Sequence, residues 1–95
     1  MAVVVQLPVI SASRDDATRL EDAMEAVMAA RGGPPAGLMM HVAWPVDDGF
    51  VLCQVWRTEA EARTSFAESV IPELTRLGLP HGELSVRAVW SLARP

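Results

Sequence analysis

The stretch "HVAWPVDDGFVLCQVW", residues 41–56, decides the fold because it predicts two strands joined by a tight turn. Its "VDDG" segment, residues 46–49, is a turn signature between two runs of β-branched and aromatic residues. With the turn at this place, His41 lies directly opposite Gln54 on the neighbouring strand. A slip of one residue would mix polar and apolar side chains on both faces, so we expect the unslipped register.

A strand and a helix are predicted before this strand pair. The first strand is mostly β-branched or apolar. Because Pro8 cannot donate a hydrogen bond, we expect the pairing to be interrupted there or the strand to end early. The helix begins at a capping box with the S-x-x-D spacing of Ser13 and Asp16. It carries an apolar stripe at helical spacing and ends at a Gly-Gly-Pro-Pro run.

A second helix and a last strand are predicted after the pair. The helix follows a capping box formed by Thr58 and Glu61, and it ends at Gly78. Pro72 lies inside its apolar stripe. Because proline lacks an N–H and clashes with the preceding turn, we expect a kink there or two short helices. The last segment alternates between apolar and polar residues, as a strand does.

The order β-α-β-β-α-β covers all 95 residues and predicts one α+β domain. It is the order of the ferredoxin-like fold, an antiparallel sheet with both helices on one face. The expected elements are strands 2–10, 37–45, 49–57 and 84–93, and helices from 14 to 30 and from 59 to the stop at Gly78.

The predicted register divides the strand pair into an apolar face and a mixed face. Since the apolar face is uniform up to Arg57, we expect it to pack under the helices, with Cys53 as a small buried hydrophobic residue. The apolar face consists of Leu38, Met40, Val42, Trp44, Val51, Cys53 and Val55.

The mixed face combines apolar residues with a few polar ones, and no element of this chain is left to cover it. We therefore expect a second copy of the chain to cover it, giving a homodimer with a cavity on the open sheet face. Polar groups within a mainly apolar cavity are typical of a small-molecule site. This face holds Met39, His41, Ala43, Phe50, Leu52, Gln54 and Trp56. Gln6 joins it if the Val3, Val5 and Leu7 side of the first strand faces the helices. Arg87 joins it in one of the two face assignments that stay open for the last strand.

The composition excludes several classes of function. Lysine is absent, the arginines are scattered and the net charge is −4, which argues against a nucleic-acid partner. No apolar run reaches the roughly 18–20 residues of a membrane span. A single cysteine fits a reducing cytoplasm, where we expect the protein to reside. No zinc, dinucleotide or phosphate-loop motif occurs, so we expect neither a metal nor a cofactor.

The segment "HVAWPVDDGFVLCQVWRTEAEARTSFAESVIPELTRLG", residues 41–78, resembles the antibiotic biosynthesis monooxygenase family of dimeric α+β barrels. The match consists of a histidine-bearing strand, an acidic turn with glycine, a strand ending in V-W-x-[ST], and a helix with phenylalanine about ten residues on. The resemblance implies a homodimer that oxygenates a polycyclic phenol to a quinone without a cofactor. It also implies that an asparagine and a tryptophan on the third strand serve the substrate. Trp56 occupies the tryptophan-like place, whereas this chain has no asparagine and Gln54 is the nearest substitute.

The candidate catalytic residues are therefore His41, Gln54 and Trp56. His41 could act as a general base near neutral pH, but it could also be a hydrogen-bonded core residue paired with Gln54, or a metal ligand. Trp56 could be an aromatic wall for a planar ligand or plain packing. The candidate substrate-binding residues are Gln6, Met39, Phe50, Leu52 and Arg87.

Two classes of function stay open. The first is a cofactor-independent monooxygenase that acts on a hydrophobic aromatic, polyketide-like metabolite. The second is a non-catalytic homodimer that binds a small molecule or has a structural role. A cyclase or isomerase with the same fold is a further alternative.

Overall fold

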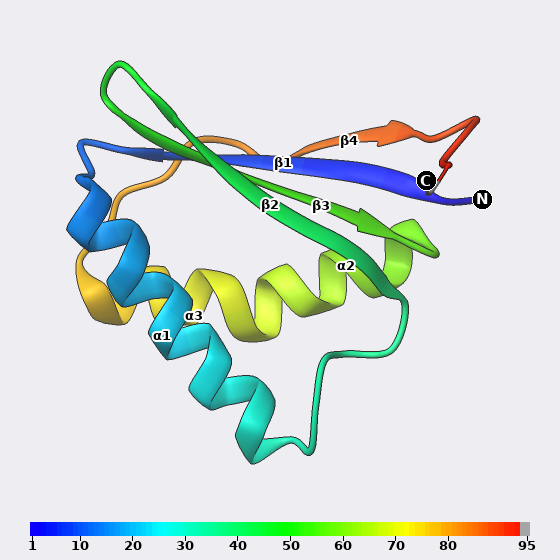
Figure 1. Cartoon of the computed structure of the whole chain (residues 1–95), viewed down its shortest axis with the longest axis horizontal. Coiled ribbons are helices and arrows are strands. Elements are labelled where there is room, and N and C mark those ends of the chain that lie inside the picture. The colour runs from blue at the N-terminus through cyan, green and yellow to red at the C-terminus, as the bar shows by residue number, and fades with distance from the viewer. Residues whose placement is uncertain (94–95) are drawn as a thin grey trace.

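The structure is a computed structural model that describes residues 1–93. It has a four-stranded antiparallel sheet in the order β2-β3-β1-β4, and Figure 1 shows the helices on one face of that sheet. The predicted α+β fold with ferredoxin-like order is confirmed. The elements are β1 (Val3–Ile10), α1 (Arg14–Ala30), β2 (Leu38–Val46), β3 (Gly49–Trp56), α2 (Glu59–Ser65), the π-helical segment η1 (Phe66–Val70), α3 (Ile71–Leu77) and β4 (Ser85–Ala88).

The β2–β3 hairpin has the predicted turn and the predicted register over most of its length. His41 pairs with Gln54, and Val46 pairs with Gly49 across the turn. The register shifts between Leu38 and Met40, where Met39 is an extra residue that makes a β-bulge. Leu38 therefore pairs with Trp56 and shares a face with Trp56 and Gln54, not with Met40 and Val42 as predicted.

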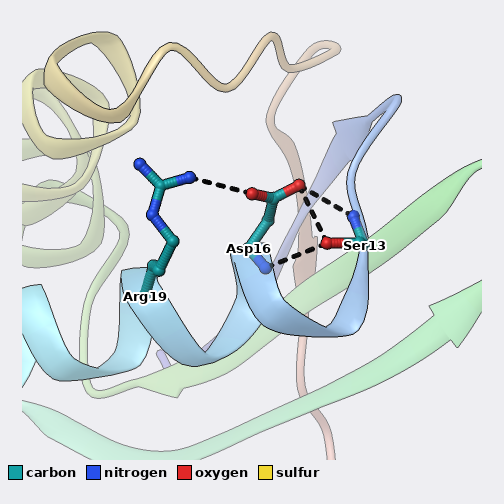
Figure 2. Close-up of polar contacts among 3 residues, drawn as sticks. All are labelled: Ser13, Asp16 and Arg19. Carbon is teal, nitrogen blue, oxygen red and sulfur yellow. Dashed lines mark hydrogen bonds and ion pairs between the residues drawn. The ribbon is translucent and has the colours of Figure 1, made fainter.

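Helix α1 starts and ends as predicted, and Figure 2 shows the capping box at its start. The backbone N–H of Asp16 donates to the Ser13 hydroxyl at 3.2 Å, and the backbone N–H of Ser13 donates to Asp16 Oδ2 at 2.9 Å. Arg19 donates to the other carboxylate oxygen at 2.9 Å. The hydrogen bond from the Ser13 backbone, helped by the Ser13 hydroxyl and by Arg19, lowers the pKa of the Asp16 carboxyl.

The second helical segment is interrupted before Pro72, as predicted. Two short α-helices, α2 and α3, flank the π-helical turn η1, in which the N–H of Ile71 donates to the carbonyl of Phe66. A π-turn is wider than an α-turn and gives room for the proline ring, which would clash with the carbonyl four residues earlier. Gly78 then ends α3 in the left-handed conformation, at φ 72° and ψ 28°.

Strand β4 is shorter than the predicted strand over residues 84–93, and that prediction was wrong at its C-terminal end. Ala88 pairs with Val3, which is the first residue of β1. Beyond it a single hydrogen bond follows, from the N–H of Val89 to the carbonyl of Ala2. The alternating sequence continues after this point, but the neighbouring strand has ended.

The assignment of the two faces of the β2–β3 hairpin was also wrong. Val3, Val5, Leu7 and Val9 of β1 are buried in the core under the helices. Val5 lies opposite Gln54 in the β1–β3 pairing, and cross-strand partners share a face. Gln54 and its partner His41 therefore face the helices. The predicted core face, with Val42 and Trp44, is the open one, because β1 sets the orientation of the hairpin.

Gly49 provides a test of the close contact between β3 and β1. A Cβ atom at Gly49 would lie far inside van der Waals contact with the carbonyl oxygen of Val9, whereas one at Gly32 would meet no atom within 4 Å. Both glycines have positive φ, so an alanine at either position carries about 1–2 kcal/mol of backbone strain. Gly49→Ala adds the steric clash, and we expect it to lower the free energy of unfolding by more than about 3 kcal/mol.

The measurement is urea unfolding of both variants, followed by far-UV circular dichroism. We expect Gly32→Ala to lower the free energy of unfolding by the backbone strain alone. Equal losses in the two variants would contradict the close approach of the strands at Gly49.

Candidate active site

A cavity of about 510 Å³ lies between the sheet and the helices. This volume falls within the roughly 300–1,000 Å³ range of small-molecule pockets. Its walls are mainly apolar, with a small group of polar side chains from β2, β3 and the α2–η1 segment. The lining residues include Leu20, Met24, Val27 and Met28 from α1, Leu38 and His41 from β2, Leu52, Gln54 and Trp56 from β3, and Ser65, Ser69 and Val70 from the second helical segment.

Three of these side chains form a hydrogen-bonded relay on the sheet wall. The indole Nε1–H of Trp56 donates to Gln54 Oε1 at 2.8 Å. The amide Nε2 of Gln54 lies 3.1 Å from Nδ1 of His41. Trp56 and Gln54 are buried, at 1% and 8% exposure, while His41 lies at the exposed end of the relay. These are the three residues that the sequence predicted as catalytic, and the structure joins them.

The relay fixes the tautomer of His41. An indole N–H can only donate, so the amide oxygen of Gln54 must face Trp56. The amide NH₂ of Gln54 then faces His41 and donates, so Nδ1 of His41 must be the unprotonated nitrogen. The neutral ring therefore carries its proton on Nε2, which is left as a hydrogen-bond donor for whatever lies beside it.

The other predicted site residues are divided between the two faces. Leu52 lines the cavity, and Phe50 lies in the buried core on the same face. Met39 occupies the bulge of β2 and is not among the cavity residues.

Gln6 pairs with Cys53, and Arg87 pairs with Val4, so both belong to the opposite face of the sheet. The sequence had placed Gln6 and Arg87 together with His41 around a cavity on the open face. Gln6 and Arg87 do lie on the open face, but His41 lies on the other face under the helices, so the three residues do not surround one cavity.

Several cavity residues were missed by the sequence analysis. Met24, Val27 and Met28 were interpreted as part of the core stripe of α1, yet they are only half-buried and border the cavity. An apolar stripe has the same sequence pattern whether it packs against a sheet or lines a cavity. Ser65 and Ser69 were not singled out either, and a serine within an apolar helix stripe was the only available signal.

The cavity has a charged rim and an uncharged interior. Glu21, Glu25 and Arg31 line it from α1 and are exposed to solvent. Within residues 1–93 no group of three or more histidine, cysteine or acidic side chains is arranged to hold a metal ion. None of the helices in that range has the length and apolar character that a membrane span needs.

The tautomer of His41 can be tested by Gln54→Glu. A carboxylate at position 54 still accepts from Trp56, but it cannot donate to His41, so we expect the proton of the imidazole to move to Nδ1. The measurement is the ¹⁵N chemical shift of both ring nitrogens, in buffer about two units above the ordinary histidine pKa of roughly 6.5. In the unmodified protein Nδ1 should have the shift of an unprotonated nitrogen.

His81 is an internal control in the same spectrum. Its Nδ1 lies 2.7 Å from the carbonyl oxygen of Gly82, which can only accept, so His81 should carry its proton on Nδ1. The two histidines are therefore expected to show opposite tautomers. A protonated Nδ1 on His41 in the unmodified protein would contradict the relay.

Comparison with known proteins supports the fold. No protein-family model matches the chain, and no curated protein matches it either. A Deinococcus radiodurans protein assigned as an antibiotic biosynthesis monooxygenase shares the fold at a TM-score of 0.61 and 16% identity, over 100% of this chain and 98% of that one.

Two further solved structures share the fold. SnoaB, a cofactor-independent oxygenase from Streptomyces nogalater, matches with a TM-score of 0.55 and 19% identity, over 96% of this chain and 93% of its own. Rv0793 from Mycobacterium tuberculosis matches with a TM-score of 0.63 and 16% identity, over 99% and 100%. These structures confirm the predicted resemblance to the antibiotic biosynthesis monooxygenase family at the level of the fold.

Proposed function

We propose that this protein is a cofactor-independent monooxygenase that oxidises a hydrophobic aromatic metabolite in the cavity between its sheet and its helices. The observation that carries the proposal is the relay of Trp56, Gln54 and His41 in the wall of a mainly apolar cavity. A flat ring system fits such walls, and the relay offers one fixed hydrogen-bond donor to an oxygen on that ring. The shared fold with SnoaB is consistent with this chemistry.

The proposed reaction converts a polycyclic phenol and O₂ into a quinone and water. One oxygen atom of O₂ forms the new carbonyl on the ring, and the other leaves as water together with two hydrogens from the substrate. The substrate supplies all four electrons that O₂ takes up. Loss of the phenolic proton makes the ring electron-rich, so stabilising the phenolate is the main task that remains for the protein.

The geometry of the relay favours a different role for His41 from the general base predicted from the sequence. Nε2 carries the proton in the neutral ring, and Nδ1 is engaged by Gln54, so neither nitrogen is available as an acceptor. In the proposed mechanism, Nε2–H donates to the phenolate oxygen and the proton passes to water at the cavity mouth. Arg87, which was predicted as a substrate-binding residue, pairs with Val4 on the opposite face and takes no part.

Oxygen uptake with anthrone as the probe tests this proposal. The enol form of anthrone is a tricyclic phenol, and its oxidation by O₂ gives anthraquinone and water. We expect the protein to accelerate uptake over buffer, and His41→Phe to lower kcat by about 10²–10³-fold, since it removes a donor to the developing anion. The matched control is His81→Phe, which changes the exposed loop histidine and should leave the rate unaltered.

The alternative function is ligand binding without turnover. A relay that ends in a donor is also suited to holding a carbonyl or phenol. If anthrone quenches the tryptophan fluorescence but is not oxidised faster than in buffer, the protein is a binding module and the oxygenase proposal fails.

We also propose that the protein is a homodimer joined through the open face of the sheet. Met40, Val42 and Trp44 on this face are exposed, at 43%, 41% and 37%. Arg87 is the only charged side chain among the paired residues of the face, so the face offers no charge pattern to an acidic or basic partner. A second copy presents the same mainly apolar surface and can cover it by two-fold symmetry.

Light scattering coupled to size-exclusion chromatography tests the dimer. We expect a mass of twice the 10.3 kDa of the chain. Val42→Arg brings an unpaired charge into the contact and should give a monomer, because burying such a charge is strongly unfavourable. Thr75→Arg places the same charge on the exposed surface of α3 and should leave the dimer intact. A wild-type mass of one chain would overturn the proposal.

A further inference from the structure

The helix layer contributes a second polar group to the cavity. Ser69 lies in the π-helical turn η1, is 5% exposed, and lines the cavity opposite the sheet wall that holds the relay. Ser65 lies one turn earlier and also lines the cavity, but it is only half-buried. Ser69 is thus the deeper of the two hydroxyl groups in the helix wall.

The hydroxyl of Ser69 makes no hydrogen bond within residues 1–93. It is the one buried side-chain oxygen or nitrogen in that range without a partner. Serine within a helix ordinarily donates to a backbone carbonyl of the preceding turn, and buried hydroxyls are nearly always satisfied. A buried polar group without a partner destabilises the fold. The presence of the Ser69 hydroxyl in the cavity wall therefore needs an explanation other than stability.

The π-turn supports a functional reading of this position. Single π-turns inside α-helices occur frequently at functional sites, and this one holds Ser69 beside the cavity. The turn accommodates Pro72, but relief of the proline clash requires nothing of the side chain at position 69. An alanine there would serve the helix better, because it would leave no hydroxyl unsatisfied.

The two polar groups define what the cavity can hold. His41 presents Nε2–H and therefore needs an acceptor oxygen, such as a carbonyl or a phenolic oxygen. Ser69 can donate or accept. Glu21 and Glu25 outnumber Arg31 at the rim, so entry of a neutral ligand is favoured over entry of an anion.

We propose that the Ser69 hydroxyl is a second ligand-binding group of this cavity, which takes a neutral fused-ring molecule with oxygen substituents at two separate positions. One oxygen accepts from His41 on the sheet wall, and the other bonds to Ser69 on the helix wall. The proposal rests on the proposed function only in that the same cavity binds an aromatic ring. It requires no turnover.

The test is a titration with two probes that differ only in their oxygens, 1,5-dihydroxynaphthalene and naphthalene, followed by tryptophan fluorescence. We expect Ser69→Ala to weaken binding of the dihydroxy probe by about 3–10-fold, the loss of one hydrogen bond, and to change naphthalene binding by less than about twofold. The matched control is Thr64→Val, which deletes an exposed hydroxyl of α2 and should change neither affinity.

Stability gives a second readout. Ser69→Ala removes a group without a partner, so its urea midpoint should equal or exceed that of the wild type. A lower midpoint would mean that the hydroxyl has a structural partner and would overturn the proposal. Equal affinity of Ser69→Ala and wild type for the dihydroxy probe would overturn it as well, while leaving the aromatic cavity in place. Failure of both probes to bind the wild type would reject this proposal and the aromatic cavity together.

Discussion

The pairing of β1 with β3 is the constraint on which the rest of the structure depends. It sets Val5 of β1 opposite Gln54 of β3, and Val5 is completely buried under the helices. The other side chains on this face of the sheet therefore also point toward the helices. His41 is one of them, because it pairs with Gln54. The polar groups of the hairpin therefore border the cavity between the sheet and the helices, and the apolar face of the hairpin is left for another surface.

Burial of these polar groups is tolerated because the relay satisfies them. The indole of Trp56 can only donate, which orients the amide of Gln54, and the oriented amide in turn determines which ring nitrogen of His41 accepts. The buried side chains of Trp56 and Gln54 are therefore both hydrogen-bonded, and neither is left with an unpaired donor. The direction of each hydrogen bond is also determined. A side chain at position 54 that could not both accept and donate would break this sequence of bonds. Glutamine is thus required by the geometry, whatever ligand the cavity holds.

Local features of the fold were predictable from the sequence, and non-local ones were not. The capping box at Ser13, the turn after Val46 and the interruption at Pro72 each depend on residues close together in the chain. The hairpin register brought His41 and Gln54 together correctly. Its orientation was wrong because a hairpin has the same register whichever face is turned inward. Only the β1–β3 pairing decides between the two, and no turn joins those strands.

The inverted faces also explain why the apolar content of a face was misleading. From the sequence we expected the most apolar face to pack under the helices, which holds when one surface is buried and the other meets water. In the proposed dimer both faces of the sheet are covered, one by the second copy and the other by the helices with the cavity. The two faces therefore need different side chains. A face that packs against its own copy is best mainly apolar, and Arg87 is the one charge among the paired residues of this face. A face that encloses a ligand has to keep a few polar groups, such as His41 and Ser69, to recognise it. In the β2–β3 hairpin, polarity therefore marks the inner face better than apolarity does, whereas in β1 and β4 the polar residues Gln6 and Arg87 lie on the open face.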